Sequence, residues 1–137
     1  MADVTELFRK AVNGELETWR QGAFPDLQAF YENGPTPPEG LMDAIWMDAS
    51  IRWYSAKEVT VGTRPRGRHI GTILTNVYFR KSEGTDKPDE LLGAIKELLR
   101  TRHLGGGVLS MPQRTISTDF FGWYKSGLLT PFKLDDA

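Results

Sequence analysis

Cysteine is absent from this chain of 137 residues. Without cysteine the chain has no disulfide framework, no thiolate metal site and no cysteine nucleophile. The sequence also lacks an apolar run long enough to cross a bilayer, so we expect no membrane segment. Its first residues, Met1–Glu6, lack the basic and apolar regions of a signal peptide, which favours a protein that stays in the cytoplasm where it is made.

Charge of one sign is not in excess either. The chain carries 17 Lys and Arg against 18 Asp and Glu. This balance argues against a general polyanion binder, because such binding depends on surplus basic side chains. Histidine is scarce, and His69 and His103 lie on separate predicted elements without ligand spacing. Because a metal site usually needs three or four ligands, we predict no metal and no cofactor.

Motifs for catalysis are also missing. Gly105–Gly107 follows a predicted helix, whereas a phosphate-binding loop precedes one and ends in Gly-Lys-Ser or Gly-Lys-Thr. The chain has no Gly-x-Ser-x-Gly elbow, and its serines have no adjacent base in the sequence. The carboxylates are spread over predicted helix ends and loops, where capping and solubility account for them. We therefore predict that the protein is not an enzyme and has no catalytic residue.

What the chain does contain is one long predicted β-hairpin over Ala44–Phe79. Both arms are rich in β-branched and aromatic residues, and Gly62–Arg68 supplies the turn residues of the tip. At about 3.3 Å per residue, the return arm alone spans roughly 35 Å. A compact chain of this length has a radius of gyration of roughly 14 Å. The hairpin is therefore either the floor of the core or a projection from it.

The first arm of the hairpin alternates between an apolar and a mixed face. The apolar set is Ile45, Met47, Ala49 and Ile51. In a regular strand, Trp46 and Trp53 lie on opposite faces. A tryptophan that faces away from the core is either exposed or covered by a neighbouring chain, and this favours an assembly. The alternative is a β-bulge that places both tryptophans in the core.

Two amphipathic helices are predicted around the hairpin. The first runs over 4–21, with Asp3 as N-cap, Glu6 in a capping-box position and Gly22 as the stop. Its apolar stripe is Leu7, Phe8, Ala11, Val12, Leu16 and Trp19. The second helix runs over 88–102, with Asp86 as a cap, and Gly105–Gly107 is expected to end it.

Short strands complete the pattern. We predict strands over 27–31, 108–113 and 122–132, with Pro131 on an edge strand and a free tail over 133–137. Strands grouped together with helices outside the group predict an α+β fold, in which two helices pack on one face of a mostly antiparallel, twisted sheet. The length suits a single domain over residues 1–137.

The predicted tip carries three arginines, Arg64, Arg66 and Arg68. They could contact an anion or nucleic acid, or they could mark a solvated hairpin end or a surface buried in an oligomer. The tip has no aromatic residue on which a base could stack. We therefore favour a protein interface at this site and expect no specific binding of nucleic acid.

Several motifs occur in a familiar order. A helix ending near Trp19 is followed by the turn Tyr31–Gly40, the return strand Gly67–Tyr78, an amphipathic helix and a closing strand from Gly122-Trp123-Tyr124 to Pro131-Phe132. Over roughly residues 4–132 this order resembles the tail terminator-like proteins of long-tailed bacteriophages and prophages. The short 83–85 loop and the acidic Asp135-Asp136 end depart from that pattern.

The resemblance implies an α+β subunit that forms a ring, typically of six copies. The ring caps the tail tube, stops its polymerisation and offers a surface to the head-tail connector. Its partners would be further copies of itself, the tail tube protein and the connector protein. It would assemble in the bacterial cytoplasm and remain at the head-proximal end of the tail in the virion.

The resemblance does not identify contact residues. From the residues themselves we predict that Arg64, Arg66, Arg68, Trp46 and Trp53 contribute to the subunit or tail interface. Two other classes stay open. A head-completion or head-tail connector protein would bind on the portal side, and a small nucleic-acid-binding domain would show an affinity that falls steeply with salt.

Overall fold

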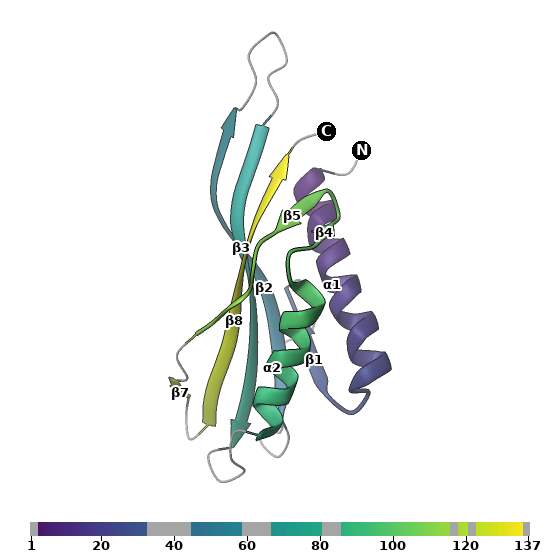
Figure 1. The fold of residues 1–137 in the computed structure, drawn as a ribbon, viewed down its shortest axis with the longest axis vertical. Helices are drawn as coiled ribbons and strands as arrows, with labels where there is room; N and C mark the ends of the chain where they lie inside the picture. The colour runs from purple at the N-terminus through teal and green to yellow at the C-terminus, as the bar shows by residue number, and fades with distance from the viewer. Residues whose placement is uncertain are drawn as a thin grey trace.

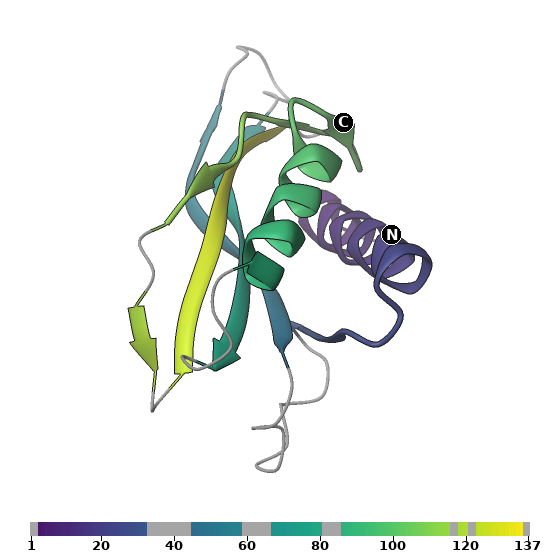
Figure 2. The ribbon, with the colours of Figure 1, turned by 60° about the horizontal axis from the view of Figure 1, so that its bottom comes forward.

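The structure is a computed structural model that describes residues 3–32, 45–58, 67–80, 86–115, 118–120 and 123–135. Two helices lie side by side on one side of a single sheet, and no helix among the described residues covers the other side (Figures 1 and 2). The elements are α1 (Val4–Ala23), β1 (Gln28–Tyr31), β2 (Trp46–Glu58), β3 (Gly67–Arg80), α2 (Asp86–Leu99), β4 (His103–Leu104), β5 (Gly107–Leu109), β6 (Gln113–Arg114), β7 (Thr118–Phe120) and β8 (Trp123–Asp135).

The sheet has eight strands among the described residues, in the order β1-β2-β3-β8-β5-β4, while β6 and β7 also pair with β8. All pairs are antiparallel except that of β1 with β2, which is parallel. This arrangement confirms the predicted α+β class, with a mostly antiparallel sheet and both helices on one face.

The long hairpin forms the part of the sheet against which the core packs. Strands β2 and β3 pair from Trp46↔Tyr78 to Glu58↔Gly67, with a β-bulge between Trp53 and Ser55. Strand β8 then pairs with β3 from Arg68 to Arg80. Because a third strand accompanies the described part of the hairpin to its end, that part does not project as an isolated ribbon. The predicted tip lies mostly outside the described residues.

Helix α1 begins as predicted and ends slightly later. The carboxylate of Asp3 accepts hydrogen bonds from the backbone N–H of Thr5 at 3.4 Å and from its hydroxyl at 2.7 Å. The helix continues through Gly22 to Ala23, so Gly22 is not the stop. Phe8, Val12 and Leu16 form the buried stripe, whereas Leu7 is 50% exposed and does not belong to it.

The turn after α1 is tied back to that helix by Arg20. Its guanidinium donates to the carbonyl oxygens of Pro25 at 3.2 Å and Leu27 at 2.7 Å. Glu17 accepts hydrogen bonds from Arg20 and, at 2.8 Å, from the hydroxyl of Tyr31 in β1. These bonds hold β1 beside α1, and β1 pairs with β2 in the parallel direction.

Helix α2 ends at Leu99, three residues before the predicted boundary, so Gly105–Gly107 does not end it. Gly105 and Gly106 instead form the β4–β5 turn, with φ values of +57° and +85°. This left-handed conformation favours glycine because a Cβ would crowd the backbone. A Cβ at Gly105 would also lie 2.7 Å from the Cβ of Ala11, so the turn fits closely under α1.

The end of the chain is more ordered than predicted. The expected strand over 108–113 is broken into β5 and β6, and β8 continues to Asp135. Leu134 is buried, and Asp135 forms an ion pair with Arg68. The prediction of a free tail is therefore wrong for residues 133–135, while residues 136–137 lie outside the described ranges.

Pro131 does not lie on an edge strand, because β8 has neighbours on both sides. Its carbonyl accepts a hydrogen bond from the N–H of Ser110 at 2.8 Å, so its nitrogen faces the same side of the strand. That side is the gap between β5 and β6, where no ladder bond requires an N–H from residue 131. Proline is tolerated at the centre of this sheet because the neighbouring strand is interrupted there.

Candidate assembly surfaces

Trp46 and Trp53 lie on opposite faces of the sheet, as the regular alternation predicts. The Trp53 ring packs on the core, 6.2 Å from the ring centroid of Phe8 and 5.1 Å from that of Phe132. Trp46 stacks on Tyr78 on the other face, with centroids 3.9 Å apart and an interplanar angle of 9°. The alternative that a bulge places both in the core is wrong, because the bulge at Tyr54 comes after Trp53.

Trp46 is the centre of an aromatic stripe, which we define as Phe30, Trp46 and Tyr78. Its members come from β1, β2 and β3 and cross the face that the helices leave open. Phe30 meets Trp46 edge to face at 5.7 Å. Edge-to-face and offset-stacked aromatic pairs add to the energy of area burial, so the three rings are held in one arrangement.

A polar network fixes the stripe. Asp48 accepts hydrogen bonds from the Tyr78 hydroxyl at 2.9 Å and from the Asn76 amide at 3.0 Å. Burial, together with the negative charge of Asp48, raises the pKa of Tyr78 well above its ordinary value, so the phenol stays protonated and donates. A rigid aromatic surface with a polar group beside it is typical of the contacts that anchor one protein on another.

Of the three predicted tip arginines, the structure describes only Arg68. It lies in β3, and its Nε and Nη2 donate to the two carboxylate oxygens of Asp135 at 2.7 and 3.0 Å. This pairing raises the pKa of Arg68. The guanidinium is thus held by a bidentate bond within the chain. Arg64 and Arg66 lie outside the described residues.

One edge of β2 is only partly covered. Strand β1 pairs with β2 from Trp46 to Ala49, and the carboxylate of Glu32 accepts the next free N–H, that of Ile51. Over residues 52–58 no described strand pairs with this side of β2. We call this segment the distal edge of β2. A signal for this edge is present in the sequence, since the strand predicted over 27–31 is much shorter than the hairpin arm.

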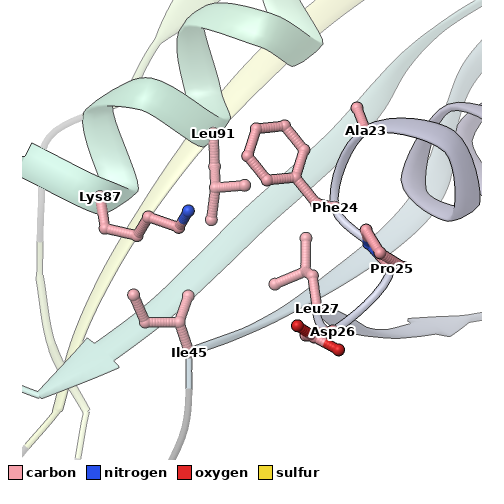
Figure 3. Close-up of a pocket in the computed structure, with 8 residues that line it drawn as sticks. All are labelled: Ala23, Phe24, Pro25, Asp26, Leu27, Ile45, Lys87 and Leu91. Atoms are coloured by element: carbon pink, nitrogen blue, oxygen red, sulfur yellow. The ribbon is translucent and has the colours of Figure 1, made fainter.

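A pocket of about 410 Å³ opens between the end of α1, the start of β1 and the first turn of α2 (Figure 3). Phe24, Leu27, Ile45 and Leu91 line its apolar part, and the ammonium of Lys87 lies 5.0 Å from the Phe24 ring centroid. Such a pocket can accept an apolar side chain from a partner. Sequence analysis missed it, because its lining comes from three separate segments of the chain.

Two further features of the described residues bear on function. They contain no group of three or more His, Asp or Glu arranged to hold a metal ion. Neither α1 nor α2 combines the length and the apolar character of a membrane-spanning helix.

Comparison with known proteins gives a fold and no family. No protein-family model matches the chain, and no curated protein matches it in sequence. A solved protein whose name describes no function has a TM-score of 0.72 at 14% identity, over 94% of each chain. A chain in the virion of a native gene transfer agent particle has a TM-score of 0.58 at 13% identity, over 99% of this chain and 100% of that one. At these identities the likeness shows a shared fold.

Proposed function

We propose that this protein is a structural assembly protein of a phage-like particle and acts as its tail terminator. The observation that carries the proposal is the whole-chain likeness to a chain of a gene transfer agent virion, since both chains are covered almost completely. The order of sequence motifs, which resembles tail terminator-like proteins, agrees with it.

In this proposal six copies form a ring on the last layer of the tail tube. The ring stops tube polymerisation and presents its other surface to the head-tail connector protein. The protein acts without catalysis or cofactor, first in the bacterial cytoplasm and then at the head-proximal end of the tail. Copies, the tail tube protein and the connector are its partners.

The aromatic stripe supports a contact role for the open face of the sheet. Trp46 and Phe30 are half-buried in the isolated chain, whereas Tyr78, on which Trp46 stacks, is buried and supports them from the adjacent strand. Aromatic residues are enriched at protein interfaces, where they supply rigid contact area. Trp53 contributes indirectly, because its ring supports the core beneath β2. Arg64 and Arg66 remain predicted contacts.

The test is the mass in solution by light scattering over a range of concentrations, repeated with purified tail tubes and followed by electron microscopy of the tube ends. Before tubes are added we expect mostly monomers. With tubes we expect a ring of about six chains, seen as density confined to one end of each tube. A strict monomer that ignores tubes would refute the terminator role.

The same virion likeness also suits a head-completion or head-tail connector protein. That alternative predicts binding to the portal side of heads and none to tube ends, so a parallel run with purified heads separates the two. Binding to DNA that falls steeply as salt rises would instead support a nucleic-acid-binding domain.

A further inference from the structure

We propose that the distal edge of β2 pairs with an extended segment of a second copy of this chain. In the same contact, a hollow beside that edge receives an apolar side chain of the second copy. The inference rests on the proposed ring assembly, because it requires copies of this chain to meet side by side.

The backbone of the distal edge points outward at Ala56. Within β2, the N–H of Ile51 reaches Glu32 and therefore faces away from β3. The direction of the backbone N–H alternates along a strand, so the N–H of Trp53 also faces away from β3. The bulge at Tyr54 then shifts this alternation by one residue. The backbone N–H groups of Ser55 and Lys57 therefore face β3, and that of Ala56 faces outward. An edge that no strand of the described residues pairs with is a template for pairing with another strand.

The hollow lies on the helix side of this edge, at the start of α1. Its volume is about 410 Å³, and its lining residues are Thr5, Trp53, Tyr54, Ser55, Ala56 and His69. Tyr54, the bulged residue, is 59% exposed. A strand added along β2 would direct alternate side chains into this hollow, as in β-strand addition, where main-chain bonds give affinity and pockets give specificity.

A second copy offers a matching segment on its opposite flank. Beyond β8 the sheet ends in short pieces, and residues 110–115 run antiparallel to β2, since β2 is parallel to β8 and β6 is antiparallel to it. The N–H of Thr115 donates to the carbonyl oxygen of Gly127 in β8. By alternation, the backbone N–H and C=O of Arg114 face outward. Met111 lies in the same segment and is 40% exposed.

The two flanks suit a head-to-tail contact. A cyclic ring needs two different patches on each subunit, one of which meets the other on the neighbour. The distal edge of β2 and the 110–115 segment are two such patches, on opposite flanks of one sheet. Arg114 does not add an uncompensated charge near Arg52 and Lys57, because Asp89 accepts its hydrogen bond at 3.0 Å.

Cross-linking tests the contact directly, since the chain has no cysteine of its own. Ala56→Cys and Met111→Cys proteins are mixed on tail tubes, and separately at high concentration without tubes, and treated with a short bis-maleimide. Docked pairs are held at millimolar effective concentration, so we expect about tenfold more heterodimer than for Ala56→Cys mixed with Gly93→Cys. Gly93 lies on α2 and is exposed, with open space around it. Equal yields in the two mixtures would overturn the proposal.

A second variant tests the backbone bonds. Ala56→Pro removes an outward N–H and leaves the β2–β3 ladder intact, because proline is tolerated where its nitrogen faces solvent on an edge. We expect it to fold as the wild type does, by circular dichroism, and to lose ring formation on tube ends. Ala56→Ser, which keeps the N–H, should retain ring formation. If the proline variant assembles like the wild type, the proposal is wrong.

The outcomes separate this inference from the proposed function. Tube capping by both the wild type and Ala56→Pro would leave the terminator role standing and remove the edge contact. Selective cross-linking by protein that ignores tube ends would support the edge contact and refute the terminator role.

Discussion

The two faces of the sheet differ in what their side chains do. On the face covered by the helices, Met47, Ile73, Val77 and Leu128 are fully buried. On the open face, Asp48 and Asn76 bond each other beside the aromatic stripe, and several side chains there are half-exposed. The covered face carries the apolar burial that stabilises the fold. On the open face Tyr78 is buried, while Trp46 and Phe30 stay half-buried beside the polar groups. The proposed contact through the aromatic stripe therefore lies on the open face.

The largest expected effect is on the covered face, at Phe8. Its ring is fully buried between Trp53 and Phe132, so Phe8→Ala leaves a cavity and should lower the free energy of unfolding by about 3–5 kcal/mol. Leu7→Ala is the matched control, since Leu7 is adjacent in sequence but 50% exposed, and it should change stability by less than about 1 kcal/mol. Urea titration measures both. Equal losses would show that α1 is oriented differently.

The two tryptophans compare the faces directly. Trp53→Ala should cost about 3 kcal/mol of stability, at the low end for a core tryptophan because the ring is half-buried. Trp46→Ala should cost only about 1–2 kcal/mol, through the lost stacking on Tyr78, but should abolish capping of tail tubes. Urea titration and electron microscopy of tube ends give the two readouts. A Trp46 variant that still caps tubes would remove the stripe from the proposed contact.

Close packing between strands predicts the next effect. A Cβ at Gly71 would lie 2.5 Å from the carbonyl oxygen of Arg52 and 2.7 Å from the Phe132 ring, so Gly71→Ala should destabilise the protein by about 1–3 kcal/mol. Gly93→Ala meets open space in a helix and should stabilise the protein by about 0.5–1 kcal/mol. Thermal unfolding measures both changes. A neutral Gly71→Ala would mean that β2 and β3 can move apart.

The smallest effect concerns pH. The hydrogen bonds to Glu17, mainly from Arg20 and then from Tyr31 and Gln21, lower the pKa of Glu17 from 4.5 to about 2. A lowered folded-state pKa contributes stability above the unfolded value that is lost as pH falls towards the folded value. We therefore expect a loss of stability between about pH 5 and pH 2 that is smaller in Glu17→Gln. Urea midpoints across this range measure it; parallel curves would assign the acid sensitivity to other groups.

Sequence patterning predicted the hairpin, the α+β class and the sides of Trp46 and Trp53, because strand alternation is a local property of the chain. The same patterning placed Leu7 in the buried stripe of α1, but Leu7 is 50% exposed and lies beside that stripe. It also missed the pocket between α1 and α2 and the hydrogen bonds to Asp48, since these bring together residues that are far apart in sequence.

By itself, the sequence determined where the long strands and the two helices form, since periodicity, caps and turn residues act over a few neighbours. Tertiary structure decided the rest. Pro131 is tolerated in a central strand because β5 and β6 leave a gap beside it, and a side chain is excluded at Gly105 because Ala11 of α1 lies against it. Asp135 is held in a strand because Arg68 lies opposite it. Each of these outcomes depends on a partner that only folding brings near.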